Sequence, residues 1–174
     1  DLHPRVRRQR QMCIRDRASK DWDLLIVSPK KNLIAAIELK SQVGSYGNNL
    51  NNRTEESLGS SEDFWTAFRE NAFSCNQSPW LGYMMVVGKD EESTHVVKVN
   101  EPHFFVRKEF KEASYLDRYR ILCQRLVLEH KYSAVSLIAT TVKGSYENLA
   151  DNISIDTFID SFRGHLLGNE SEFK

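Results

Sequence analysis

Residues 21–28 and 33–40 read DWDLLIVS and LIAAIELK, two short apolar runs with charged residues at one end of each. The residues between them, Pro29-Lys30-Lys31-Asn32, include turn formers. Apolar runs of this length on either side of a turn predict a β-hairpin. If Lys30 and Lys31 form the middle of a four-residue turn, Asp23 faces Glu38 and Asp21 faces Lys40.

All four of these charged residues then project from the same face, because side chains along a strand alternate between faces. The opposite face is predicted to be core and receives Trp22, Leu24, Ile26, Ile37 and Leu39. Two opposed carboxylates repel each other unless something neutralises them, and a hard divalent cation with oxygen ligands does so. The pattern therefore indicates Mg²⁺-dependent phosphodiester hydrolysis, in which a lysine orients the attacking water.

Acid and lysine pairs across a hairpin are also common on solvated faces, and an Asp followed later by Glu-x-Lys arises by chance in many proteins. The placement favours the chemical interpretation. These charges end strands that are otherwise very apolar, and a polar stretch rich in Gly, Asn and Ser, residues 41–60, follows at once. We expect this stretch to be a long loop, which is uncommon unless functional or disordered.

The rest of the chain predicts alternating helices and strands. A helix with an aromatic stripe is expected from Ser60 or Ser61, and a Ser114–Asp117 capping box predicts a second helix to about Lys131. Ser154 or Asp156 is expected to cap the last helix, which carries Phe158, Ile159, Phe162 and Leu166. Strands are predicted at Tyr83–Val87, weakly at Thr94–Val99, and at Ala134–Val142. The order predicts the α/β class, with a mixed β-sheet flanked by helices.

The composition suits one domain of 174 residues with 24 basic and 24 acidic side chains. Residues 1–17 hold six arginines and two aspartates, a net +4, so the remainder carries −4. We interpret 1–17 as a disordered basic arm or as a non-native sequence artefact, the latter being favoured, and 18–174 as the functional domain. Since the body is acidic, a nucleic-acid site must be local.

No apolar stretch is long enough for a membrane span, and the N-terminus lacks a secretory signal, so a cytoplasmic protein is expected. Three cysteines, Cys13, Cys75 and Cys123, form no pair at C-x-x-C spacing and are predicted to be reduced thiols.

Asp23 and Glu38-Leu39-Lys40 resemble the PD-(D/E)xK nuclease core. The wider sequence resembles the XhoI family of type II restriction endonucleases, over most of residues 18–168. The likeness rests on Asp21–Leu24, Glu38–Gly44, Gly47–Asn49, Asn51–Glu56, Asp63–Glu70, Pro79–Tyr83 and Ser114–Tyr119.

The resemblance implies an Mg²⁺-dependent homodimer that cuts both strands of double-stranded DNA at the palindrome CTCGAG. Asp23 and Glu38 would bind the metal with the Leu39 carbonyl, and Lys40 would position the attacking water. A cognate DNA methyltransferase would act on the same site without forming a stable complex. Family members extend further at the N-terminus, so the fold is expected to be truncated there. Two alternative functions stay open: a DNA-binding module without cleavage activity, and an α/β protein-interaction domain.

Base recognition in the major groove typically uses Arg for guanine and Asn or Gln for adenine. The stretch after Lys40 offers such side chains next to the cutting site, and we expect it to contact DNA, although asparagines also simply make turns. The candidate base-reading residues are Gln42, Asn48, Asn49, Asn51, Asn52 and Arg53. Phosphate contacts or an exposed helix face would explain Lys108, Lys111, Arg118 and Arg120.

Overall fold

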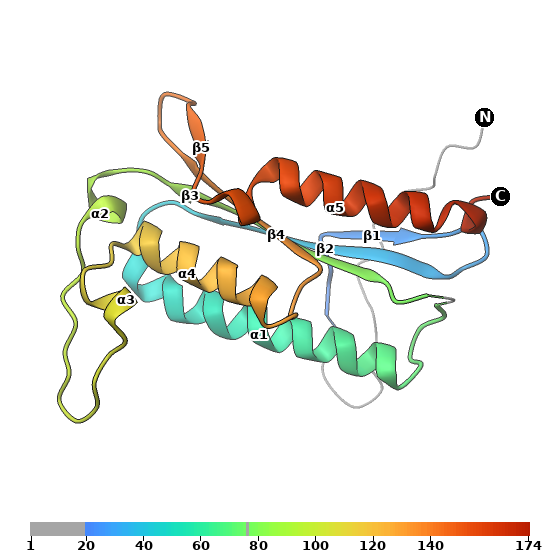
Figure 1. Ribbon diagram of the computed structural model, residues 1–174, viewed down its shortest axis with the longest axis horizontal. Coiled ribbons are helices and arrows are strands. Elements are labelled where there is room, and N and C mark those ends of the chain that lie inside the picture. The colour runs from blue at the N-terminus through green and yellow to red at the C-terminus, as the bar shows by residue number, and fades with distance from the viewer. Residues whose placement is uncertain (1–19, 76) are drawn as a thin grey trace.

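The computed structural model describes residues 20–75 and 77–174, so the two interpretations of residues 1–17 lie outside the described part. Within these residues, five strands form one mixed sheet in the order β1-β2-β3-β4-β5 (Figure 1). β1 and β5 pair antiparallel with their neighbours, whereas β2, β3 and β4 are parallel. The strands are β1 Leu24–Val27, β2 Leu33–Gln42, β3 Trp80–Gly88, β4 Ala134–Thr140 and β5 Tyr146–Asn148.

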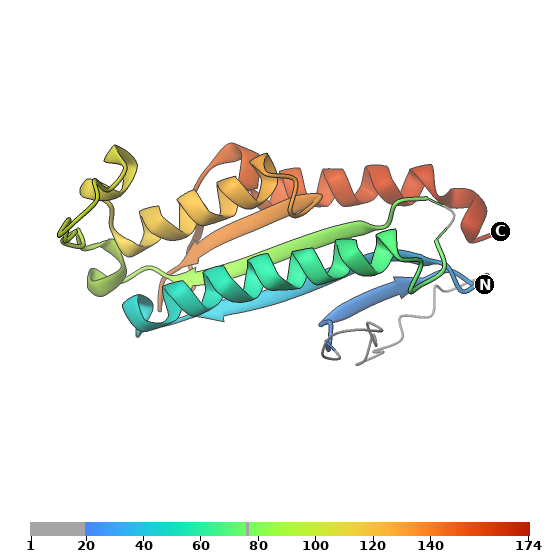
Figure 2. The same ribbon diagram turned by 90° about the horizontal axis from the view of Figure 1, so that it is seen from below.

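Helices cover both faces of this sheet, which confirms the predicted α/β class with flanking helices (Figures 1 and 2). α1 (Tyr46–Arg69) and α4 (Tyr115–Leu128) lie on one face, and α5 (Ile155–Gly168) lies on the other. Short helices complete the fold: α2 Glu91–Thr94, α3 Lys108–Lys111, and the 3₁₀ turns η1 Asp151–Ile153 and η2 Glu170–Glu172. Within the described residues, no helix combines the length and the apolar character that crossing a membrane requires.

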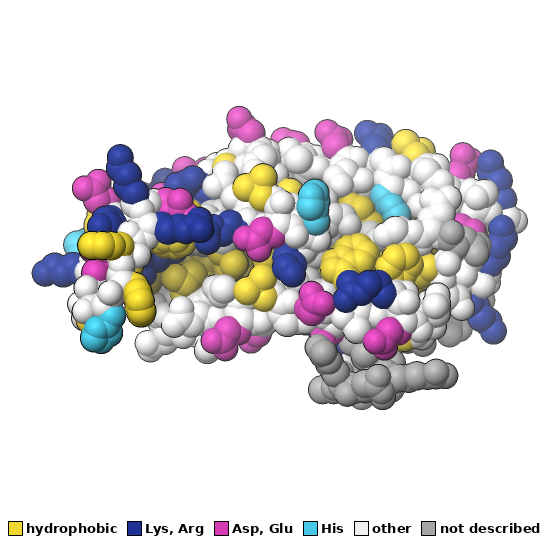
Figure 3. Space-filling model, turned by 60° about the horizontal axis from the view of Figure 1, so that its bottom comes forward, with side chains coloured by type: hydrophobic (Ala, Val, Ile, Leu, Met, Phe, Trp, Pro, Cys, Tyr) yellow, Lys and Arg dark blue, Asp and Glu magenta, His cyan; other side chains and the backbone are white. Residues whose placement is uncertain are grey.

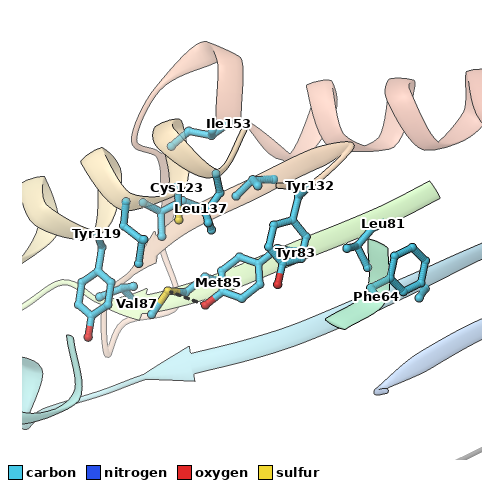
Figure 4. Packing of buried hydrophobic residues seen from close by; sticks show 14 of the residues in the cluster. Phe64, Leu81, Tyr83, Met85, Val87, Tyr119, Cys123, Tyr132, Leu137 and Ile153 are labelled. Carbon is cyan, nitrogen blue, oxygen red and sulfur yellow. Dashed lines mark hydrogen bonds between the residues drawn. The ribbon is translucent and has the colours of Figure 1, made fainter. Parts of the chain in front are cut away.

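The central strand β3 contributes to a core on each side of the sheet. Its alternate residues Leu81, Tyr83, Met85 and Val87 are fully buried against α1 and α4 (Figure 4). On the other side, Trp80 packs against Phe158 of α5, with 5.0 Å between the ring centroids. Strands buried on both faces are expected where helices cover both sides of a parallel sheet.

The predicted hairpin register is confirmed at the end that carries the charged residues. Leu24 pairs with Ile37 and Leu25 with Ala36, which continues toward Asp23 opposite Glu38. The predicted four-residue turn is wrong, because the connection closes with Ser28 N–H donating to the Asn32 carbonyl at 2.9 Å. The pairing shifts by one residue between Ile26 and Val27, where β2 has one extra residue. The shorter turn therefore leaves the register at the charged end unchanged.

The long polar loop predicted for residues 41–60 is wrong, since α1 begins at Tyr46 rather than near Ser60. Its Asn, Gly and Ser residues have weak intrinsic helix propensity. Tertiary packing decides the outcome, because small side chains such as Ser57 and Ser60 are buried within the fold. The hydroxyl of Tyr132 also donates a hydrogen bond to the Ser57 carbonyl at 2.9 Å.

Several predicted core positions also need correction. Leu39 is 49% exposed and Ile159 is 50% exposed. Trp22 is buried, but on the α1 side of the sheet, where its ring packs edge-on against Phe64 at 5.4 Å. Alternation does not hold there because Trp22 precedes the first residue of β1. The strand predicted at Thr94–Val99 is reduced to an isolated bridge from Val96 to Ser114.

Local signals with a defined hydrogen-bond geometry are confirmed. Ser114 caps α4 and forms the reciprocal capping box with Asp117, and Ser154 caps α5. Cys75 and Cys123 are free thiols, as predicted. Burial raises the pKa of Cys75 to about 11 and that of Cys123 to about 12, so neither is a thiolate nucleophile. Cys13 lies outside the described residues.

Candidate active site

The predicted acid and lysine on β2 lie next to each other on its α1 side. The Glu38 side chain is almost fully buried, and its Oε1 atom lies 2.6 Å from the Lys40 Nζ atom. The second carboxylate oxygen, Oε2, lies 3.2 Å from the Nζ atom of Lys20. A buried carboxylate needs such compensation, because removing a charge from water is costly unless it is paired. Glu38 is thus held between two ammonium groups.

Asp23 joins this group from the residue just before β1. Its Oδ2 atom accepts a hydrogen bond of 2.8 Å from the backbone N–H of Leu39, the residue between Glu38 and Lys40. This bond attaches the Asp23 carboxylate to the same part of β2. Asp21 is exposed and makes no ion pair with Lys40 among the described residues, so that part of the predicted cross-strand arrangement is not formed.

Helix α1 supplies Glu56, which the sequence reasoning did not place in the site, and Arg53, which it assigned to DNA contact. Glu56 Oε2 lies 4.0 Å from Lys40 Nζ, and the same oxygen lies 2.7 Å from Arg53 Nη1. On a helix, Arg53, Glu56 and Ser60 fall on one face, and Ser60 accepts a hydrogen bond from Lys20. This spacing is visible in the sequence, but only once residues 46–60 are known to be helical.

Two tyrosines close the buried side of the site without adding charge. Tyr83 of β3 and Tyr132 lie with their rings 5.2 Å apart (Figure 4). Burial raises the pKa of both hydroxyls well above the usual value, and the negative charge of Glu38 adds to the effect. Both therefore stay protonated at neutral pH. The groups of this site that carry charge are therefore the carboxylates and the Lys20, Lys40 and Arg53 side chains.

The two carboxylates have oxygens available for a cation. Glu38 Oε2 is buried and has no hydrogen-bond donor in suitable geometry, despite the nearby Lys20. Asp23 uses only Oδ2 in its bond to Leu39. Among residues 20–75 and 77–174, no three side chains of the His, Cys, Asp and Glu types come together. The donor set thus fits a hard cation that keeps several waters, as Mg²⁺ does, rather than an ion fully enclosed by side chains.

The candidate DNA-reading residues fall into two environments. Gln42 is buried at the end of β2, and its amide donates to the Gly44 carbonyl at 2.6 Å. Asn48, Asn51 and Asn52 are exposed on the first turns of α1, next to the partly exposed Asn49 and Arg53. Asn49 donates to the Ser45 carbonyl at 3.1 Å, so its amide is partly engaged within the helix start. Five of the six candidates thus share one helix, directly after the strand that carries Glu38 and Lys40.

Known proteins match this chain over most of its length. It is 48% identical to the type II restriction enzyme BstVI of Geobacillus stearothermophilus, in an alignment that covers 86% of this chain and 71% of that protein. It is 46% identical to the type II restriction enzyme XhoI of Xanthomonas vasicola over 65% of this chain and 46% of that protein. The type II restriction enzyme AbrI of Azospirillum brasilense is 48% identical over 51% of this chain and 40% of its own length.

No solved structure matches the chain significantly. The model of the family described as restriction endonuclease XhoI matches residues 4–150, well over half of the chain. With this match and with the identity to three type II restriction enzymes, the chain belongs to the XhoI restriction endonuclease family.

Proposed function

We propose that this chain is a type II restriction endonuclease that hydrolyses both strands of double-stranded DNA at CTCGAG, with Mg²⁺ as cofactor. The observation that carries the proposal is that Lys40 lies 2.6 Å from the buried Glu38 on β2, while Asp23, just before β1, accepts a hydrogen bond from the backbone N–H of Leu39 between them. The family and the similarity to the enzyme XhoI support the reaction and the choice of site. We assign the endonuclease domain to residues 18–174.

Asp23 and Glu38, together with the Leu39 carbonyl, are the residues that would hold Mg²⁺ in this proposal. When bound, the ion supplies Lewis acidity that lowers the pKa of a water and offsets negative charge on the phosphate. The buried position of Glu38 excludes most solvent from one side of the site. The ammonium of Lys40 orients the attacking water by donating a hydrogen bond to it, in line with the scissile phosphorus.

Sequence recognition is assigned to the segment that follows Lys40. The exposed amides of Asn48, Asn51 and Asn52 are free to reach base edges in the major groove, where Asn pairs with adenine. Gln42, Asn49 and Arg53 remain candidates, although each already has a partner within the protein. Because CTCGAG is palindromic, we propose a homodimer whose two-fold axis coincides with that of the site. It would act in the cytoplasm, and the cognate methyltransferase would modify the same site independently.

The direct test of this function is digestion of a plasmid that carries one CTCGAG site, with Mg²⁺ or with a chelator. We expect linear product only with Mg²⁺, because without the ion the charge on the phosphate is not offset. The control plasmid differs by one base within the site and should stay uncut, since a mismatched base pair costs about 1–3 kcal/mol in recognition.

A gel-shift on the same DNA separates the other outcomes. Specific binding without cleavage at any Mg²⁺ concentration would identify a binding module. A chain that neither binds nor cuts CTCGAG would contradict the proposed function.

Glu56 is expected to act as a positioning residue for Lys40. In the structure, the Lys40 ammonium is paired with Glu38. When Glu38 binds a cation, its negative charge is partly neutralised and it attracts Lys40 less strongly. Glu56, whose carboxylate lies 4.0 Å from the Lys40 ammonium, then holds Lys40 in place. Such an exposed ion pair contributes about 0.5–1 kcal/mol. Glu56→Gln should therefore lower the single-turnover cleavage rate about two- to fivefold without changing DNA affinity.

The matched control for this variant is Glu55→Gln, since Glu55 is an exposed neighbour on the same helix and makes no ion pair with a described residue. Glu56→Asp should recover part of the rate, because it keeps the charge. Equal rates for Glu56→Gln and the unaltered chain would show that Glu56 does not position Lys40.

A further inference from the structure

A loop of residues 97–113 projects from the end of the molecule toward which β2, β3 and β4 run (Figures 1 and 2). Its two ends are tied together at the start of α4. The Val97 N–H donates to the Ala113 carbonyl at 3.1 Å, and Arg118 donates to the Val97 carbonyl at 3.3 Å. A loop that is closed at its base in this way stands out from the surface as one unit.

The far part of the loop is also closed, by the carboxylate of Glu101. Its Oε1 atom accepts a hydrogen bond of 2.6 Å from the Val106 N–H and lies 3.0 Å from the Lys111 ammonium. Both contacts favour the charged form and lower the pKa of Glu101. The tip, residues 101–106, is therefore a defined turn.

This tip presents two neighbouring aromatic side chains to solvent. Phe104 is 87% exposed and Phe105 is 93% exposed, the most exposed aromatic side chains among the described residues. Placing large apolar side chains in water is unfavourable, and adjacent exposed apolar residues mark surfaces that bind a partner. The loop buries neither ring, although the hydrogen bond between Val106 and Glu101 holds the tip that carries them.

Free cations flank the two phenylalanines. Lys98, Arg107 and Lys108 are exposed and form no ion pair with any described carboxylate. Two of the three acids of this loop are paired, Glu101 with Lys111 and Glu109 with Arg125, while the third, Glu112, is exposed. In a domain whose residues 18–174 carry a net −4, this is a local positive region. Figure 3 shows basic and hydrophobic side chains together at this end of the molecule.

We propose that loop 97–113 is a DNA-contacting element in which Phe104 and Phe105 pack into the minor groove while Lys98, Arg107 and Lys108 bind the flanking phosphates. This inference rests on the proposed function. Apolar wedges flanked by cations suit this task, because the rings insert between base steps from the minor groove and the cations bind the polyanion. A second copy of the chain is disfavoured as the occupant, since a two-fold contact would bring the same unpaired cations together.

The test compares the unaltered chain with Phe104→Ala/Phe105→Ala for binding to a labelled CTCGAG duplex without Mg²⁺, measured by fluorescence anisotropy. We expect affinity to fall about tenfold or more, as for alanine replacement of aromatic residues that contact bases. Ile159→Ala/Leu167→Ala removes two exposed apolar side chains of α5 on the opposite face of the sheet and should bind like the unaltered chain. Because all four side chains are at least half exposed, thermal unfolding should stay nearly unchanged.

A second variant tests the cations separately. Arg107→Ala/Lys108→Ala should lower the slope of log affinity against log salt concentration by about 2, because two phosphate contacts are lost. Light scattering on every variant reports the oligomeric state.

Unchanged DNA affinity in both double variants would overturn the proposal, as would a loss of self-association, which would assign the tip to a protein interface. If the unaltered chain binds no duplex, the proposed function itself fails and this inference fails with it.

Discussion

Lys40→Ala is expected to lower the single-turnover rate of DNA cleavage at saturating Mg²⁺ by about 10²–10⁴-fold. The Lys40 ammonium lies 2.6 Å from Glu38, and in the proposed function it orients the attacking water. Lys20 cannot take its place, since it is hydrogen-bonded to Ser60 and lies 4.8 Å above the Trp22 ring. The rate is measured on a duplex with one CTCGAG site under enzyme excess, so that product release does not limit it.

DNA affinity separates this catalytic effect from misfolding or lost binding. Lys40→Ala should bind the same duplex within a few-fold of the unaltered chain, while Glu38→Ala should lose cleavage as well because the cation loses a carboxylate. Lys143→Ala is the matched control, since Lys143 is exposed on the turn after β4 and forms no ion pair with a described residue. Cleavage that persists in both the Lys40 and Glu38 variants would refute the assignment of the site.

Phe64→Ala is expected to reduce the free energy of unfolding by about 3–5 kcal/mol, because it opens a cavity in the core. The Phe64 side chain is fully buried, and its ring lies 5.0 Å from Trp65, 5.5 Å from Phe73 and 5.4 Å from Trp22. Trp22 directly precedes Asp23, so this cluster also fixes the segment that presents the Asp23 carboxylate. Urea unfolding followed by tryptophan fluorescence gives the change.

Phe68→Ala offers the comparison within the same helix. Phe68 is only partly buried and contacts Trp65 and Phe73 at longer centroid distances, 6.2 and 6.4 Å, so its loss should cost clearly less. If Phe64→Ala costs less than about 1 kcal/mol, the aromatic cluster is not the anchor of this part of the fold.

The hairpin shows how far short-range sequence patterns reach. Two apolar runs around a turn were enough to predict which residues pair, and the observed pairing of Leu24 with Ile37 continues toward Asp23 opposite Glu38. The length of the turn was not predictable, because it depends on the left-handed backbone of Lys31, φ 67°, and on the register shift next to it. A strand register is determined by which side chains it buries, and the turn, one residue shorter than predicted, is compensated by one extra residue in β2, where the register shifts.

Helix α1 shows the opposite case. Its first half has Asn, Gly and Ser where helices usually have Ala, Leu, Glu and Lys, so local preference favours a loop. The helix forms because it connects parallel strands β2 and β3 and because Tyr46, Ser57 and Ser60 are buried, with the Tyr46 hydroxyl donating to the Gly88 carbonyl of β3. That placement brings Glu56, with its partner Arg53, to Lys40, and no pattern in the sequence alone could locate them there.

The sequence by itself determined the pairing of β1 with β2, the capped helices α4 and α5, and the nearness of Glu38 and Lys40 on one strand, because each depends on neighbours a few residues away. Only the tertiary structure decided the helix at residues 46–69, the exposure of Leu39 and the side of the sheet that Trp22 packs against. These depend on burial against segments far along the chain, and that burial outweighs local propensities of less than about 1 kcal/mol per residue.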